Sequence, residues 1–206
     1  MSLPSILGAI GTGVGLIRAV PQLVKLLRAR EAFGVSADTA ATSSVVSFGW
    51  ATYGYVTDQP FVTFATGSSG LIFALVTFFA LRFGRPVREL KIAPIWLAAL
   101  VLAYRFFGGK GLGVALPISV LAANIPQIWT AHKEGDLTDL SLGTWLLSIT
   151  DGLVWGLYSL LQHDMSILVY AVFQLTTSGL IVFFKIEHGK RLGAKSLAPF
   201  FGGTLD

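Results

Sequence analysis

A Pro-Gln pair occurs twice in this chain of 206 residues, as Pro21-Gln22 and as Pro126-Gln127, 105 positions apart. Many other residues recur at the same offset without a gap. In the first half these residues are Ser36, Thr39, Ser43, Trp50, Tyr53, Leu75, Phe78 and Phe79. Their matches in the second half, in the same order, are Ser141, Thr144, Ser148, Trp155, Tyr158, Leu180, Phe183 and Phe184. An internal match of this length indicates two copies of one structural unit. In membrane proteins, two parallel copies that face each other commonly build a path for a solute.

The composition indicates that lipid surrounds much of the chain. Hydrophobic residues make up 53% of it and charged residues 13%, and the mean hydropathy is +0.70. A soluble domain carries about 25% charged residues, so too little polar surface remains here to cover a globule in water. The net charge of +4 does not indicate nucleic acid, because the basic residues fall between apolar runs. We therefore expect a lipid bilayer, and no nucleic acid, around the protein.

Several kinds of chemistry are excluded by the residue types. The chain has no cysteine, so it has no disulfide, thiolate metal site or cysteine nucleophile. Its three histidines, His132, His163 and His188, are scattered and show no metal-ligand spacing. No enzyme motif of the HExxH or GxSxG type is present, so we expect no enzyme, metal or cofactor. The first basic residue is Arg18, so we expect the first apolar segment to be a retained membrane helix and no signal peptide.

Seven segments reach the length of about 20 residues that a membrane helix needs. The fourth is the weakest, because it is short and Arg105 interrupts it. The predicted segments are 4–27, 39–57, 60–83, 92–107, 112–131, 140–161 and 165–186. With seven crossings, twelve of the fifteen basic residues fall on one side of the membrane. Such an excess marks the cytoplasmic face, so we expect the plasma membrane, with the N-terminus outside and the C-terminus in the cytoplasm.

The predicted fold is therefore an all-α integral membrane protein with seven transmembrane helices, in which a linker helix joins two parallel three-helix bundles. Three crossings invert the chain, so a single linking helix is needed to make the second copy parallel to the first. The predicted division is 1–84 for the first repeat, 85–111 for the linker helix, 112–188 for the second repeat and 189–206 for a cytoplasmic tail. Two halves in one chain suffice for a path in a monomer, and a homo-oligomer is not excluded.

The two Pro-Gln pairs lie inside predicted helices. A proline removes an amide donor and clashes with the carbonyl four residues earlier, at a cost of about 3 kcal/mol in an ordinary helix. One interpretation is a static kink, since prolines are frequent in membrane helices. Because the pair is duplicated, we favour a hinge in each half, formed by Pro21 with Gln22 and by Pro126 with Gln127.

Aromatic and acidic residues mark a candidate path between the halves. Trp50 and Trp155 lie near mid-depth, where two large rings can hold a small amphipathic solute or simply pack between helices. Tyr53 and Tyr158 follow them by one turn toward the outside and are candidates for an outer gate. Asp58 and Asp164, on the short outer turns, are the acidic candidates for the same gate.

Asp151 lies at the centre of the sixth predicted helix, one turn before Trp155. An ionised carboxylate at that depth costs about 2.5–3.5 kcal/mol, so it must face a cavity, take up a proton or pair with a cation. Arg18 is the basic residue at comparable depth. One interpretation is a structural Arg18–Asp151 ion pair, and the other is a carboxylate that binds a proton or the hydroxyl groups of a solute.

Three further polar residues are candidates for the lining of a pocket. They are Thr66 in the third predicted helix, Asn124 beside the second Pro-Gln pair, and Gln174 in the seventh predicted helix. Each is also of a type that commonly forms hydrogen bonds between membrane helices, which is the alternative interpretation.

The repeated Pro-Gln pairs, the Trp-x-x-Tyr in each half and the expected helix layout resemble those of the PQ-loop repeat proteins of the MtN3/saliva group, which includes SWEET and SemiSWEET transporters. The resemblance covers about residues 5–187. It implies sugar transport by alternating access. It also implies that Pro21 and Pro126 are hinges, that Trp50 and Trp155 line the pocket, and that Tyr53, Tyr158 and Asp164 form the outer gate.

The chain departs from this pattern at one point. Sugar-carrying members have an asparagine sixteen residues after the pocket tryptophan, where this chain has Thr66 and Ala171. The fold also resembles cystinosin-type proton-coupled amino-acid carriers and, more distantly, the KDEL receptor. Three hypotheses follow: facilitated diffusion of a sugar, which we prefer; a proton-coupled carrier of an amino acid or small metabolite, with Asp151 as the proton site; and a receptor or scaffold that transports nothing.

Overall fold

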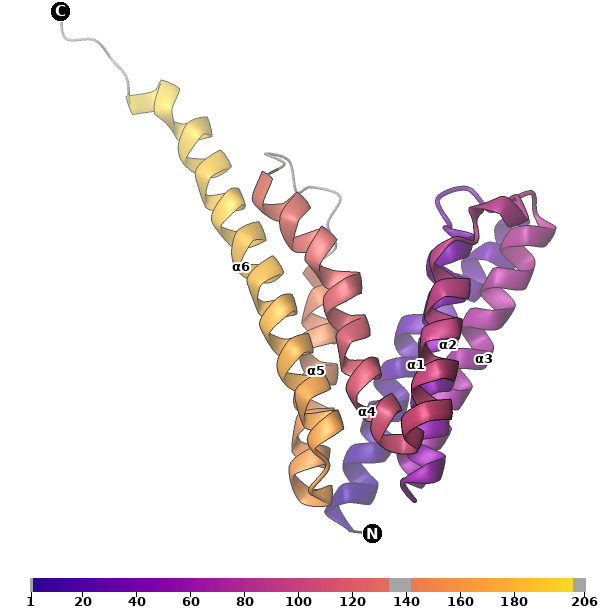
Figure 1. The fold of residues 1–206 in the computed structure, drawn as a ribbon. Helices are drawn as coiled ribbons and strands as arrows, with labels where there is room; N and C mark the ends of the chain where they lie inside the picture. Colours follow the sequence, from indigo (N-terminus) through magenta and orange to yellow (C-terminus); the bar gives the residue numbers. More distant parts are fainter. Residues whose placement is uncertain (1, 134–141, 202–206) are drawn as a thin grey trace, which may run out of the picture.

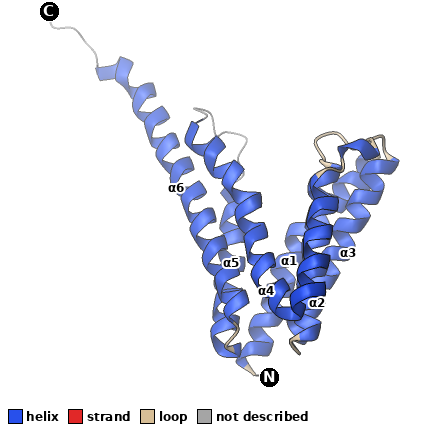
Figure 2. Cartoon of the chain, viewed as in Figure 1, coloured by secondary structure: helices blue, strands red, loops and turns tan. Residues whose placement is uncertain are grey.

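The computed structural model describes residues 2–133 and 142–201, without the side chains of residues 126, 127, 130–133 and 188–201. Its described part is helical, with short connecting loops (Figure 2). The elements are α1 (Leu3–Ala29), α2 (Ala37–Val56), α3 (Pro60–Arg82), the 3₁₀ turn η1 (Val87–Glu89), α4 (Ile92–Lys133), α5 (Leu142–Gln162) and α6 (Met165–Phe201).

Local signals account for where the first helices begin and end. Ser36 precedes α2, and its side chain accepts a hydrogen bond from the backbone N–H of Thr39 at 3.2 Å, as expected of an N-cap. Pro60 is the first residue of α3, where a missing amide proton costs nothing. Arg30 ends α1 in the left-handed conformation, with its N–H bonded to the Leu26 carbonyl.

The helices form two groups that diverge from one end of the molecule like the arms of a V (Figure 1). In one arm α3 contacts both α1 and α2, and in the other α6 contacts both α4 and α5. The arms meet through contacts of α1 with α5 and of α2 with α4. The N-terminus lies at the end where the arms meet, and α6 runs toward the opposite end (Figure 1).

Helix α4 contains two of the predicted segments, 92–107 and 112–131. They meet at Gly108, whose backbone is not helical (φ 58°, ψ −146°). That conformation lies in a region where side chains other than glycine are strained. The chain turns back at this point, so the first part of α4 lies with α2 and the second part with α6 (Figure 1). The predicted linker helix and the helix after it are thus separated by a single non-helical residue, Gly108.

Four of the described helices have a stretch long and apolar enough to cross a membrane: α1, α3, α4 and α6, the last two over Ile92–Ile125 and Met165–Glu187. Helices α2 and α5 are long enough but more polar. Their polar residues include Ser43 and Ser47 in α2 and Ser148 and Asp151 in α5, which line an internal cavity and do not need to face lipid. The polarity that lowers the hydropathy of these two helices is therefore inside the protein.

The turns α2–α3 and α5–α6 have the same backbone geometry. Asp58 and His163, which occupy equivalent positions at the 105-residue offset, both have positive φ, at 55° and 54°. The next residues repeat a backbone hydrogen bond: Gln59 N–H donates to the Gly54 carbonyl, and Asp164 N–H donates to the equivalent Ser159 carbonyl. The two acidic gate candidates, Asp58 and Asp164, are therefore not at equivalent positions, because Asp58 matches His163 and Asp164 matches Gln59.

Two buried clusters hold the helices together. One contains Trp50, Tyr53, Trp155 and Tyr158 and so joins the two arms where they meet. The other, around Leu26, lies within α1, α2 and α3 near the far end of that arm. The arms therefore share a core at one end, and the first arm has its own core at the other.

The last helix is longer than expected. The prediction ended a membrane segment at residue 186 and placed a separate tail at 189–206, but α6 continues to Phe201. Seven of the fifteen residues from 187 to 201 are Lys, Arg, Leu or Ala, which are good helix formers, so the helix continues beyond the apolar stretch in spite of Gly189, Gly193 and Pro199. Residues 202–206 of the expected tail lie outside the described part of the chain.

Candidate functional site

A central cavity of about 640 Å³ lies between the two arms. All six predicted solute-binding residues line it, one or two from each of the helices α2 to α6: Trp50, Thr66, Asn124, Asp151, Trp155 and Gln174. Arg18 of α1 lines it too. Sequence reasoning thus selected residues that the fold brings together around one space, although binding itself remains a prediction.

The cavity extends away from the end where the arms meet. Its α2 lining runs from Trp50 back to Asp38 near the start of the helix. At 1.5 Å per residue, this stretch covers about 18 Å. Trp96 and Trp145, near the starts of α4 and α5, also line the cavity. These residues give the cavity a long aromatic and hydroxyl-rich lining.

Each predicted pocket tryptophan is buried and packs edge-on against the tyrosine one turn later. The Trp50 and Tyr53 ring centroids are 5.6 Å apart, and those of Trp155 and Tyr158 are 5.3 Å apart. Trp50 also meets Tyr170 of α6, at 5.4 Å. Edge-to-face contacts of this kind fix ring orientation. The tryptophans are thus held in defined positions at the deep end of the cavity.

Arg18 and Asp151 lie within ion-pair distance, with Arg18 Nη1 3.6 Å from Asp151 Oδ2. The Tyr170 hydroxyl donates a hydrogen bond to the same oxygen at 2.6 Å. The Asp151 side chain is 5% exposed, whereas that of Arg18 is 37% exposed. The carboxylate is therefore satisfied inside the protein, and the guanidinium has a free side toward the cavity.

The other predicted polar residues already make hydrogen bonds. The Asn124 amide donates to the Thr177 hydroxyl at 2.7 Å, which links α4 to α6. The Thr66 hydroxyl donates to the Val62 carbonyl in its own helix, and the Gln174 amide donates to Ser178. For Asn124 the structure thus shows the interhelical bond that was the alternative interpretation, in addition to its place in the cavity lining.

At the end where the arms meet, hydrogen bonds join three polar side chains of the two arms. The Tyr53 hydroxyl donates to Asp164 Oδ2 at 2.8 Å, and the Gln59 amide donates to the same oxygen. The other carboxylate oxygen, Oδ1, accepts the backbone N–H of Ile167 and so caps α6. Asp164 is therefore fixed by its own helix and hydrogen-bonded to the opposite arm through Tyr53 of α2 and through Gln59.

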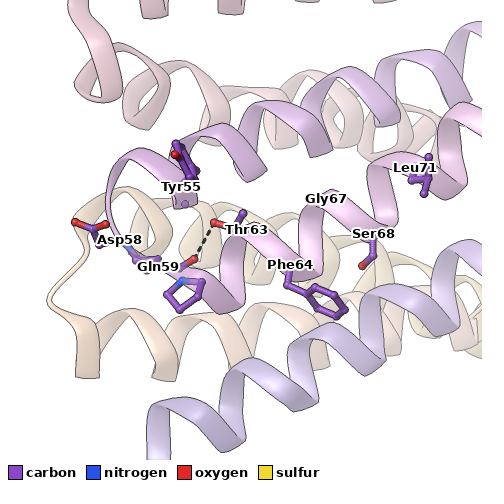
Figure 3. Close-up of a pocket in the computed structure, with 10 residues that line it drawn as sticks. Tyr55, Asp58, Gln59, Thr63, Phe64, Gly67, Ser68 and Leu71 are labelled. Carbon is purple, nitrogen blue, oxygen red and sulfur yellow. Dashed lines mark hydrogen bonds between the residues drawn. The ribbon is translucent and has the colours of Figure 1, made fainter.

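The remaining gate candidates lie differently. Tyr158 is buried near Asp164, but within the described part of the chain its hydroxyl makes no hydrogen bond. Asp58 is exposed and faces a different pocket of about 950 Å³ beside the α2–α3 turn, where Figure 3 shows it next to Gln59 and Tyr55. The turn puts Gln59, one residue later, toward the other arm, and the gate role of Asp58 remains a prediction.

The predicted hinge residues lie within the helices α1 and α4. Pro21 is within α1, on an exposed face, and Gln22 is half-buried beside it. Pro126 and Gln127 belong to α4, and their side chains lie outside the described part. The hinge role of all four residues remains a prediction.

Sequence reasoning missed Gln59, Tyr170 and Asp38. Gln59 had a signal, because it stands opposite Asp164 at the 105-residue offset. Tyr170 had none, since Ala65 occupies the equivalent position. Asp38 accepts the backbone N–H groups of Lys91, Ile92 and Ala93, and so caps the start of α4 from α2. Such contacts between distant segments leave no local pattern.

No group of three or more potential metal ligands occurs among the described residues. The polar residues of the cavity are hydroxyl, amide, one guanidinium and carboxylate groups. This set can bind hydroxyl groups and stack on a ring, but it contains no nucleophile paired with a base.

No known protein family and no curated protein matches the chain by sequence. The structure is similar to the 3.7 Å structure of a eukaryotic SWEET transporter, with a TM-score of 0.70 and 12% sequence identity. The match covers 92% of this chain and 100% of the other. This likeness shows a SWEET-like fold. Together with the long apolar helices, it indicates an integral membrane protein.

Proposed function

We propose that this protein is a membrane transporter that moves a small solute, preferably a sugar, by alternating access. The observation that carries the proposal is the central cavity between two arms that the hydrogen bonds of Tyr53 and Gln59 to Asp164 link at one end. The SWEET-like fold supports the same function. A cavity of about 640 Å³ is large enough for a mono- or disaccharide.

In this proposal α4 counts as two crossings, because the chain reverses at Gly108. The protein then crosses the membrane seven times, with a linker between two three-helix repeats. The basic loops place the N-terminus outside and the C-terminus in the cytoplasm of a plasma-membrane protein. The closed end is then the outer one, and the structure represents a state that faces the cytoplasm.

Each group in the site then has a defined role. Trp50 and Trp155 pack against the apolar faces of a sugar ring. Thr66, Asn124, Asp151 and Gln174 bond its hydroxyl groups. Opening to the outside requires the Tyr53–Asp164 and Gln59–Asp164 hydrogen bonds to break while the arms approach each other at the other end, with the Pro-Gln pairs absorbing the bend.

Solute counterflow into liposomes that contain the purified protein tests the proposal. We expect exchange of one or a few sugars from a panel of sugars, polyols, sugar acids and amino acids, and loss of that exchange in Trp155→Ala. A stable, correctly inserted protein that exchanges no solute, but co-purifies with a protein partner, would instead support a receptor or scaffold.

The second candidate is a proton-coupled carrier of an amino acid or another small metabolite. It is favoured by the burial of the Asp151 carboxylate beside the cavity. A pH gradient across the liposome membrane separates the two candidates. Facilitated diffusion predicts solute uptake that does not depend on the pH gradient. The coupled carrier predicts uptake driven by the gradient, which Asp151→Asn abolishes.

A further inference from the structure

Three pairs of equivalent positions in the cavity lining carry different chemistry. Arg18, Asp151 and Tyr170 all line it. The positions equivalent to them at the 105-residue offset are Ala123, Val46 and Ala65, which line the same cavity. One wall, formed by α1, α5 and α6, therefore carries a polar cluster, and the equivalent positions of α4, α2 and α3 are apolar.

Within the polar cluster, the guanidinium is the group available to a solute. Arginine has five N–H donors, and charge-assisted hydrogen bonds are typically 2.7–2.9 Å long. The separation of 3.6 Å between Arg18 Nη1 and Asp151 Oδ2 is longer, and Arg18 also interacts with the Tyr170 hydroxyl. These two partners leave N–H donors of the guanidinium over, and its side chain is 37% exposed and lines the cavity, so an acceptor of a bound solute can reach it.

Asp151 and Tyr170 hold the guanidinium in this place. The carboxylate is 5% exposed, accepts the Tyr170 hydroxyl at 2.6 Å and lies beside Arg18. Tyr170 in turn packs against the Trp50 ring. The charge of Arg18 is therefore balanced in a cluster that is tied to one of the two pocket tryptophans.

The charges of the described lining favour a solute without net charge. Arg18 and Asp151 neutralise each other, and the Asp38 carboxylate is bonded to the N-terminus of α4. An anionic solute at Arg18 would lie close to Asp151, and a cationic one would meet the guanidinium. A hydroxyl group can accept from Arg18 without either penalty.

We infer that Arg18, positioned by Asp151 and Tyr170, binds the hydroxyl groups on one edge of a neutral polyhydroxylated solute and so fixes its orientation in the cavity. This inference rests on the proposed sugar transport. The planar guanidinium donates to neighbouring oxygens of that edge. Val46 and Ala123, the equivalents of Asp151 and Arg18, also line the cavity and offer no side-chain hydrogen bond.

The test is counterflow of the best-exchanged sugar and its monodeoxy analogues, in wild type and in the double variant Arg18→Gln, Asp151→Asn. The double variant removes both charges together and keeps polar side chains of similar size. In wild type, removing one or two neighbouring hydroxyls should lower exchange tenfold or more. In the variant the same analogues should lose less than twofold relative to the parent sugar. Equal losses in both proteins for every analogue would overturn the inference.

A control variant outside the cavity lining, Phe78→Ala at a side chain 60% exposed, should leave the pattern of analogue losses unchanged. If the double variant does not fold, Arg18→Lys takes its place, because lysine keeps the charge but lacks the planar guanidinium. Removing the same hydroxyls should then lower exchange less than it does in wild type. A wild-type protein that exchanges only amino acids, or nothing, would refute sugar transport and this inference with it. Sugar exchange with an unchanged analogue pattern refutes the inference alone.

Discussion

The two halves of the chain are alike in one region and differ in another. The turn between the second and third helices is the same in both halves, whereas the walls of the cavity differ. At the turns, Asp58 and His163 have the same left-handed backbone, although one is acidic and the other is not. Along the walls, equivalent positions carry different chemistry, as with Asp151 and Val46. The backbone can thus be kept while side chains diverge, because a turn depends on backbone conformation and a binding wall depends on side-chain groups.

The hydrogen-bonded contact between the arms combines equivalent backbone positions with different side chains. Gln59 and Asp164 occupy equivalent positions and are bonded to each other, so the axis relating the two halves passes between them. Two aspartates there would repel each other, and two glutamines would offer no charge to the Tyr53 hydroxyl. The difference between the halves at this point is therefore what allows one acceptor to bind two donors.

The largest expected effect comes from the matched tryptophans. Trp50→Ala and Trp155→Ala should each lower the initial rate of counterflow more than about tenfold and destabilise the protein by about 3–5 kcal/mol, because each removes a buried ring. Counterflow and the thermal stability of the solubilised protein measure the two effects. Phe78→Ala, at a side chain 60% exposed, is the control and should change neither. A large loss in only one tryptophan variant would show that the halves contribute unequally.

The second-largest effect is a difference between the two predicted gate tyrosines, Tyr53 and Tyr158. Tyr53→Phe removes a hydrogen bond to a carboxylate, worth about 1.5–3 kcal/mol, and should shift the population toward opening at the closed end. Since the chain has no native cysteine, a cysteine introduced at Ser47 in the cavity reports this opening through its rate of labelling by an impermeant thiol reagent from that side. Tyr158→Phe is the matched control and should leave the rate unchanged. Equal rates in both variants would contradict the assigned role of Tyr53.

A smaller difference is expected at two equivalent glycines. A Cβ at Gly8 would lie 2.5 Å from Phe61 Cβ, and one at Gly113 would meet the Ser166 hydroxyl, at the position equivalent to Phe61. Gly8→Ala should cost about 1–2 kcal/mol, because a ring attached there cannot move aside without disturbing its helix. Gly113→Ala should cost less, because the Ser166 hydroxyl can rotate away and the remaining contacts, to Tyr53 Cε2 at 3.1 Å and Ser166 Cβ at 3.3 Å, need shifts of only a few tenths of an ångström. Thermal unfolding of both variants measures the difference, and a larger cost at Gly113 would contradict the packing described for α1 and α3.

The smallest effect is expected at Asp58. Asp58→Asn keeps a residue type that tolerates positive φ, and the side chain is exposed outside the cavity, so stability should change by less than about 0.5 kcal/mol and counterflow should not change. Asp164→Asn, measured alongside, should increase labelling from the closed end. A loss of transport in Asp58→Asn would restore Asp58 to the gate that the sequence predicted.

Local patterns in the sequence determined the helices, their need for lipid and the residues that share the cavity. Apolar length and the offset of 105 residues are visible along the chain, and they were sufficient to select Trp50 and Trp155 together with polar residues such as Thr66 and Gln174. The same offset contained the Gln59–Asp164 match, although the prediction named Asp58 and Asp164 for the gate and did not select Gln59.

Only the tertiary structure decided which groups are partners. The turn of α4 at Gly108, the bond of Tyr170 to Asp151 and the two donors to Asp164 all depend on segments that are distant in sequence. A helix period records which face of a segment is apolar, but it does not record which side chain the opposite helix presents. The reason is physical: burial acts on each residue separately, whereas a hydrogen bond requires two atoms to be placed within about 3 Å of each other by the whole fold.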